Sequence, residues 1–414
     1  MRRYFKENAA HLRRLSPNIA VFIVYGLLYD AGLNIYRPFA MKYISRLGGD
    51  ETFISLFNSL PGIIAAAALL PGAVFLSRFK NMKKVTMVIF FISRAFLIFI
   101  ALIPLFPEPL RPLIFVLLMS LMHFPDALSQ SAVQASLGTF FKNGNVRATA
   151  ISLRIKFGNI FIPLVTVLTG MIISVFPRND SQVFMFYQAF FVIAFIVGMF
   201  EIKTFAKFKE ETDVEPGPKP NLKTVAEIFK DKKFMNYFLS IIFFYFSWHS
   251  GWALSGIYQI KALGASEMWL AFFAVAMGIA SFSSAGFWNK RLNKHGHNKT
   301  LILAASCVAL NMFVIAIIPN IHLMLIAMAY TGFASIGINI SLLNNLINVT
   351  PDKNRMIYIG VFNTFVSISL GIAPLVALLI MNNIGVVYTM FTVGAMRIVA
   401  VLFLYAYNKR KNFI

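Results

Sequence analysis

Long apolar stretches separated by short polar ones cover almost the whole chain. A helix needs about 20 apolar residues to cross a bilayer. Stretches of that kind lie at residues 18–42, 52–76, 84–105, 111–137, 148–175, 183–203, 234–260, 267–289, 300–319, 322–347, 355–381 and 384–408. The pattern predicts an all-α membrane protein with twelve transmembrane helices.

The overall composition leads to the same class of protein. Of the 414 residues, 58% are hydrophobic and 13% are charged, and the mean hydropathy is +0.71. A soluble domain has roughly 25% charged residues. We therefore expect most of the surface to face lipid.

The basic residues are divided very unequally between the two sides of the predicted membrane. Of the 38 lysines and arginines, 28 lie in the loops and terminal segments on the side of the N-terminus. Five lie on the opposite side, namely Lys42, Arg46, Arg111, Arg178 and Lys261. Cytoplasmic loops are enriched in Lys and Arg, so both termini are predicted to be cytoplasmic and the membrane to be the cell (inner) membrane. The net charge of +22 then reflects topology, and we expect no nucleic-acid partner.

The longest polar stretch divides the chain in the middle. Residues 204–233 carry mixed charges and contain Pro216-Gly217-Pro218-Lys219-Pro220, which cannot form a helix. We interpret this stretch as a cytoplasmic linker between two six-helix bundles, residues 1–203 and 234–414.

The two halves also resemble each other in sequence. Leu47-Gly48 and Glu51 recur as Leu263-Gly264 and Glu267 at an offset of 216, and Arg147 before Pro163 resembles Arg355 before Pro374. Parallel repeats of this kind are typical of transporters that bind their substrate where the repeats meet.

These features resemble the major facilitator superfamily over essentially the whole chain. That family carries a Gly-x-x-x-Asp-Arg motif after its second span and an echo after its eighth. Here the two copies keep Arg78 and Arg291, but Ser77 and Lys290 replace the aspartate. The resemblance implies alternating access, with spans one, four, seven and ten lining a central cavity. We expect a cytoplasmic gate that uses Arg78, Arg147, Arg291 and Arg355 to bind helix C-termini or acids.

Two acids, Asp30 and Asp126, are predicted to lie well inside the spans. Buried charge is costly in a membrane, so each acid needs a partner or a watery cavity. Helical spacing places Asn34 and Arg37 on the face of Asp30, and His123 on the face of Asp126. We favour proton coupling through one of these carboxylates. The alternative is a permanent structural pair with Arg37 or Arg94.

The bases predicted inside the spans outnumber these acids. Arg37, Arg94, Arg154 and Lys156 lie in the first half, and their charge would favour an anionic substrate if they point inward. The alternative is that all but Arg94 extend to the membrane surface. Arg397, deep in the twelfth span, has no evident partner.

The second half offers aromatic and amide groups in place of charge. Trp248, His249 and Trp252 lie in the seventh span, and Asn344 and Asn345 in the tenth. Indoles can stack on a flat or sugar-like substrate, while the amides and the imidazole orient it by hydrogen bonds. The alternative is that both tryptophans pack between helices.

The sequence thus predicts a secondary transporter, a symporter or antiporter, with a small-molecule substrate and the lipid bilayer as its partners. Proton-coupled movement of an anionic or polar metabolite is the first reading. Export of drugs or amphiphiles, a non-transporting receptor and a lipid scramblase are the alternatives. We expect a monomer, no enzymatic activity and no cofactor. No phosphate-binding glycine loop is present, and His295 and His297 lack a third metal ligand.

Overall fold

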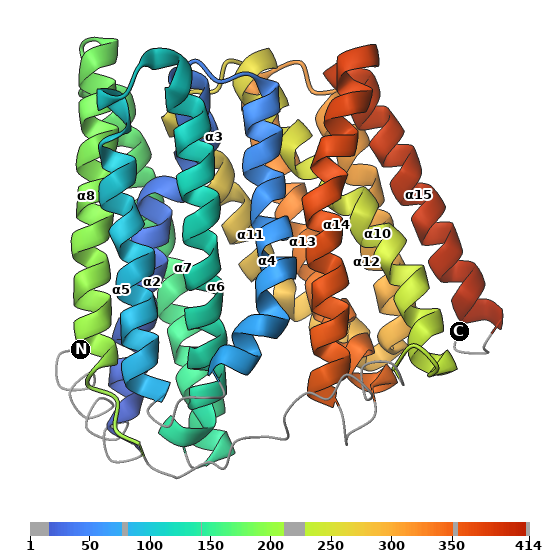
Figure 1. Cartoon of the computed structure of the whole chain (residues 1–414). Helices are drawn as coiled ribbons and strands as arrows, with labels where there is room; N and C mark the ends of the chain where they lie inside the picture. Colours follow the sequence, from blue (N-terminus) through green and yellow to red (C-terminus); the bar gives the residue numbers. More distant parts are fainter. Residues whose placement is uncertain (1–15, 77–81, 142, 211–227, 351–354, 411–414) are drawn as a thin grey trace, which may run out of the picture. The chain divides into compact units, whose positions relative to one another are not determined.

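The structure is a computed structural model that describes residues 16–76, 82–141, 143–210, 228–350 and 355–410 (Figure 1). This part of the chain is helical throughout. The first-half helices are α2 (Asn18–Tyr36), α3 (Ala40–Arg46), α4 (Glu51–Leu76), α5 (Met82–Ala101), α6 (Arg111–Phe140), α7 (Gly144–Val175) and α8 (Asp180–Phe205). The second-half helices are α10 (Lys232–Ile257), α11 (Glu267–His295), α12 (His297–Ala316), α13 (Ile321–Val349), α14 (Arg355–Ile384) and α15 (Val386–Arg410).

Each predicted span overlaps one of these helices, and the first overlaps α2 and the start of α3. Within the described residues, ten segments are long and apolar enough to cross a membrane. The exceptions are α4, which is apolar over the shorter stretch Glu51–Ala67, and α10, whose serines, tryptophans and histidine lower its hydropathy. The count of twelve spans therefore stays a prediction.

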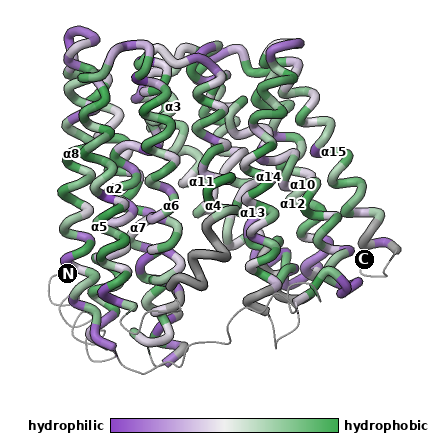
Figure 2. The backbone as a smooth tube through the Cα atoms, viewed as in Figure 1, coloured by the Kyte–Doolittle hydropathy of each residue, from purple (hydrophilic) through white to green (hydrophobic). Residues whose placement is uncertain are grey.

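Hydrophobic residues follow one another along most of the helices, as the colouring of Figure 2 shows, and many of the large apolar side chains are exposed. Leu105, Ile326 and Leu379 are 76%, 68% and 64% exposed. Apolar surface on this scale is stable only against lipid or another apolar partner. The chain is a multi-pass membrane protein.

The internal repeat is visible in the backbone. Gly48 and Gly264 both adopt a positive φ, of 88° and 63°, and each lies three residues before the first residue of a helix. A positive φ is easily adopted only by glycine. Pro163 and Pro374 each lie 19 residues after the first residue of their helix. The repeat thus preserves turn geometry as well as residue type.

The contacts within the chain divide it into two compact units. Each unit is made of two stretches that are separate in the sequence. Unit 1 consists of residues Met1–Ala40 and Pro71–Lys219, and unit 2 of Met41–Leu70 and Pro220–Ile414. In unit 1, α2 packs against α7 and α8, and α5 packs against α6 and α8. In unit 2, α10 packs against α14 and α15, and α13 against α11 and α12.

An ion pair joins the segment 41–70 to the rest of unit 2. Arg46 Nη2 donates to Glu267 Oε2 at 3.0 Å while Nε binds the other carboxylate oxygen, and the Glu267 side chain is fully buried. The carboxylate at the repeat-equivalent position, Glu51, faces Lys261 at 3.9 Å, and both of these side chains are more than a third exposed. The two acids are thus equivalent in sequence but differ in burial.

This contrast predicts unequal effects on stability. Glu267→Gln removes the charge opposite Arg46, and we expect a loss of about 1–3 kcal/mol, less than for a fully buried pair because Arg46 is partly exposed. Glu51→Gln is the matched control, because exposed pairs contribute roughly 0–1 kcal/mol. Thermal unfolding in detergent, followed by tryptophan fluorescence, measures both. Equal melting temperatures for the two variants would contradict the larger contribution of the Arg46–Glu267 pair.

Candidate functional site

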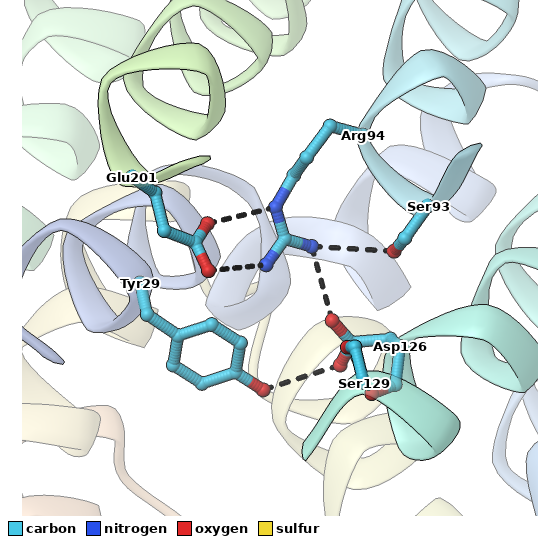
Figure 3. Close-up of polar contacts among 6 residues, drawn as sticks. All are labelled: Tyr29, Ser93, Arg94, Asp126, Ser129 and Glu201. Carbon is cyan, nitrogen blue, oxygen red and sulfur yellow. Dashed lines mark hydrogen bonds and ion pairs between the residues drawn. The ribbon is translucent and has the colours of Figure 1, made fainter. Parts of the chain in front are cut away.

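A single arginine joins two acids in the interior of unit 1 (Figure 3). Arg94 of α5 donates from Nε to Glu201 Oε2 at 3.0 Å and from Nη2 to Glu201 Oε1 at 3.3 Å. Its Nη1 donates to Asp126 Oδ1 of α6 at 3.0 Å. The side chains of Arg94, Glu201 and Asp126 are 5%, 1% and 14% exposed. We call these three residues the ion triad.

Neighbouring hydroxyl groups complete the surroundings of the ion triad. The Tyr29 hydroxyl of α2 donates to Asp126 Oδ2 at 3.1 Å, and Arg94 Nη1 also donates to Ser93 Oγ at 3.3 Å. The guanidinium further lies 5.4 Å from the centre of the Tyr29 ring. Four helices thus meet at the triad, and every triad side chain has at least one charged partner.

Local sequence makes room for this arrangement. A Cβ atom at Gly198 of α8 would lie 2.7 Å from the Cγ and Cδ atoms of Arg94, so only glycine lets the arginine cross α8 one turn before Glu201. Pro125 lies directly before Asp126 inside α6 and cannot donate a helical hydrogen bond. Both features lie within one helical turn of the acids.

Glu201 is a candidate site residue that the sequence analysis did not identify. The expectation that only Asp30 and Asp126 lie well inside the spans is wrong, because Glu201 is among the most buried polar residues of the described chain. It lies two residues before Lys203, near the end of the sixth predicted span at residues 183–203. The signal that could have found it is Ile202 and Phe205, which extend the candidate span and α8 beyond Glu201.

Asp30 has a partner of its own. Arg154 Nη2 of α7 donates to both Asp30 oxygens, at 3.2 and 3.3 Å, and the two side chains are 24% and 22% exposed. The structural alternative considered for Asp30 named Arg37 or Arg94, and the structure corrects it to Arg154. Asn34 Nδ2 donates to the Asp30 backbone carbonyl at 2.8 Å, which places both residues on one face of α2, as expected.

The four bases predicted inside the spans of the first half differ in their surroundings. Arg37 and Lys156 are exposed, whereas Arg94 and Arg154 are paired inside unit 1 with three acids. Arg154 is thus engaged in an ion pair with Asp30. His123 is half-buried on α6 and interacts electrostatically with Arg37 and Asp126. The paired groups carry one more negative than positive charge.

The predicted aromatic group of unit 2 lies on one face of α10. The Trp248 and His249 rings are nearly parallel, 6.3 Å apart, and Trp252 meets His249 edge-on at 4.9 Å. His249 Nδ1 lies 3.1 Å from Ser369 Oγ of α14. His249 is buried, while Trp252 is 42% exposed. We call Tyr245, Trp248, His249 and Trp252 the aromatic face.

Arg397, for which the sequence suggested no partner, is bound by backbone carbonyls. Its Nε donates to Ser247 O at 3.0 Å, its Nη2 to Trp248 O at 2.9 Å and its Nη1 to Val308 O at 3.0 Å. Arg397 is 2% exposed. Arg397 therefore links α15 to α10 and α12 by hydrogen bonds to backbone carbonyls and not by an ion pair.

The remaining predicted site residues lie apart from these groups. Asn345 donates to the carbonyls of His297 and Ser341, at 3.2 and 2.9 Å, which joins α13 to the start of α12. Asn344 and Arg355 lie in α13 and α14. Of the other predicted gate residues, Arg147 is exposed near the start of α7, Arg291 is half-buried in α11, and Arg78 lies outside the described residues.

These observations define a class: an all-helical, multi-pass membrane protein with ion pairs buried inside one bundle. Residues 22–351 match the family model of the Major Facilitator Superfamily. This match covers well over half of the chain, and the protein therefore belongs to the Major Facilitator Superfamily.

Solved structures show the same fold at low sequence identity. The nucleoside transporter NupG is 13% identical with a TM-score of 0.70, covering 94% of this chain and 99% of that one. A POT family transporter is 10% identical with a TM-score of 0.72, covering 95% and 96%. The human organic anion transporter TETRAN is 11% identical with a TM-score of 0.61, covering 95% and 99%. No curated protein matches the sequence significantly.

The ion triad leads to a testable prediction for the free energy of unfolding. Arg94→Leu leaves Glu201 and Asp126 without a counter-charge, and we expect it to destabilise the protein by about 3–5 kcal/mol. Adding Asp126→Asn and Glu201→Gln to Arg94→Leu removes the unpaired charges and should recover most of the loss. Lys156→Leu, at an exposed base of the same half, is the control and should shift stability by less than about 0.5 kcal/mol. Thermal unfolding in detergent compares the four proteins, and a triple variant no more stable than Arg94→Leu would refute the charge argument.

Proposed function

We propose that the protein is a proton-coupled secondary transporter that moves a small molecule across the cell (inner) membrane by alternating access. Membership of the Major Facilitator Superfamily and the likeness to solved transporters support the transporter class. Twelve spans, cytoplasmic termini and a monomeric state belong to the same proposal. The choice of protons as the coupling ion rests on the residues of unit 1.

The observation that carries the proposal is the sharing of one guanidinium by two carboxylates. Arg94 contacts Glu201 and Asp126 within 3.0 Å, and all three side chains are largely buried. One positive charge cannot neutralise two negative charges, and net charge is costly away from water. A proton bound to one of the two carboxyl groups removes the excess charge.

The two acids differ in a way that suits proton transfer. Glu201 takes two hydrogen bonds from Arg94, whereas Asp126 takes one from Arg94 and one from Tyr29. Asp126 is also the more exposed of the two, at 14% against 1%. We therefore propose that the two acids share one exchangeable proton, and that Glu201 anchors Arg94.

Alternating access supplies the step that releases the proton. When the helices shift, the distance from Arg94 to Asp126 changes, and with it the cost of leaving Asp126 charged. Proton binding and release are thereby linked to opening on one side or the other. Asp30 with Arg154 forms a one-to-one pair that is already neutral, so its charge balance gives it no comparable need for a proton.

The test measures proton movement in proteoliposomes loaded with the pH dye pyranine. Uridine, the dipeptide Ala-Ala and benzenesulfonate are added outside in turn, and a compound that moves with protons changes the internal pH. We expect at least one compound to do so with the wild type. The double variant Asp126→Asn/Glu201→Gln should abolish this change, because no carboxyl group of the triad remains to take up a proton.

The matched control is Asp30→Asn, which makes the same chemical change at the balanced pair. We expect it to keep the compound-dependent pH change, at a rate set by how well the variant folds. A pH change that persists at the wild-type rate in Asp126→Asn/Glu201→Gln, with the variant folded, would show that the triad does not couple protons.

A further inference from the structure

Two basic side chains at the turn from α11 to α12 carry buried nitrogen atoms without a hydrogen-bond partner. They are Arg291 Nε, near the end of α11, and Nδ1 of His297, the first residue of α12. In the described part of the chain, neither nitrogen has a partner within hydrogen-bond distance. Leaving a buried polar atom unpaired costs free energy, and native structures rarely do so. Each nitrogen therefore calls for a partner from outside the described residues.

Packing between α11 and α13 fixes which of their residues face each other. Ser281 Oγ donates to Gly332 O at 2.9 Å, and farther along both helices a Cβ atom at Gly337 would overlap the Trp288 ring. The two helices therefore run in the same direction. It follows that the residue one turn beyond Trp288 lies beside the residue one turn beyond Gly337.

Arg291 and Ser341 are the two residues that this register brings together. Ser341 is fully buried, and its Oγ also has no hydrogen-bond partner among the described residues. Asn345, one turn later on the same face of α13, donates to the His297 carbonyl at 3.2 Å. Three polar groups that lack partners, one each from α11, α12 and α13, thus gather at one end of these helices. We call Arg291, His297 and Ser341 the turn site.

The electrostatics of the turn site favour an anion. Lys290, Lys294 and Lys299 are exposed around it, whereas α12 and α13 contain no acid and the one acid of α11, Glu267, lies at the opposite end of that helix. The N-cap of α12 is Gly296, so no side chain caps its first backbone N–H groups, and such groups attract anions. Membrane topology alone explains exposed lysines. It does not explain buried nitrogen atoms without partners.

The position of the turn site along α11 indicates where the anion comes from. From Glu267 to Trp288 the helix rises by about 33 Å at about 1.5 Å per residue, close to the roughly 30 Å of a hydrocarbon core. The basic residues that follow Trp288 therefore lie at the level of the lipid headgroups. Phe282 and Phe287 are 60% and 48% exposed and offer apolar surface for acyl chains beside the turn. A phosphate group carried by a lipid fits this combination.

We infer that the turn site binds the phosphate group of an anionic phospholipid. Arg291 Nε and His297 Nδ1 donate to the phosphate oxygens, Ser341 adds a hydroxyl at the inner end, and the exposed lysines add attraction for the negative charge. In this role Arg291 binds a lipid in place of the acid or helix C-terminus expected of a gate residue. The inference goes beyond the proposed function, because it involves neither the ion triad nor the transported molecule.

Thermal unfolding of the purified full chain in detergent measures the binding, because a ligand of the folded state raises the melting temperature as its concentration rises. The four additions are phosphatidylglycerol, phosphatidylcholine with the same acyl chains, sodium phosphate, and sodium chloride at matched ionic strength. We expect phosphatidylglycerol to act at about tenfold lower concentration than phosphatidylcholine. Sodium phosphate should act no more strongly than sodium chloride.

Variants locate the effect at the turn site. Arg291→Gln/His297→Gln should weaken the binding of phosphatidylglycerol about tenfold, because it removes both unpartnered nitrogen donors. The matched control is Lys230→Gln/Lys232→Gln, which removes two exposed charges of unit 2 and should weaken binding less than about twofold. Ser341→Ala loses a hydroxyl that has no partner in the fold, so it should stay folded and weaken binding about threefold.

The outcomes decide the inference in both directions. Equal effects of the two lipids, or equal losses in Arg291→Gln/His297→Gln and Lys230→Gln/Lys232→Gln, would overturn it. Stabilisation by sodium phosphate beyond that by sodium chloride, lost in Arg291→Gln/His297→Gln, would show a site for soluble phosphate and overturn the lipid assignment. If Arg291→Gln/His297→Gln does not fold, Ser341→Ala against the lysine control gives the answer. No proton movement is measured, so a failure here is distinguishable from a failure of the proposed function.

Discussion

The need to neutralise charge away from water is the constraint on which the arrangement of unit 1 depends. Arg94 satisfies it by binding Glu201 and Asp126, and in doing so it holds α5, α6 and α8 at one point. The same contact leaves one negative charge in excess. Under the proposed function, a contact that a rigid protein would avoid becomes a means of taking up and releasing a proton as the conformation changes.

The two units solve the problem of buried charge in different ways. In unit 1, Arg94 and Arg154 are paired with carboxylates. In unit 2, Arg397 is solvated by backbone carbonyls and remains positive. An excess of negative charge attracts a cation, of which a proton is the smallest. This difference is the physical basis for proposing ion coupling in unit 1.

Sequence patterns predicted the helices well because hydrophobic length and glycine turns are local properties. Gly48 and Gly264 show this, since the repeat found in the sequence returns as two turns of the same kind. The site was predicted only in part. The depth of Asp126 and Arg94 was readable from the spans, but the direction of a side chain depends on which helices pack together. For that reason Arg154 was not paired with Asp30, Glu201 was missed near a span end, and Arg397 had no partner.

The central claim is that one carboxyl group of the ion triad carries a proton at neutral pH. Infrared spectroscopy tests it directly, because a protonated carboxyl group absorbs apart from carboxylate and amide groups and shifts on transfer to heavy water. The account predicts a protonated-carboxyl band in the wild type that is lost in Asp126→Asn/Glu201→Gln and kept in Asp30→Asn. A wild-type spectrum without that band, or a band unchanged in the double variant, would contradict it.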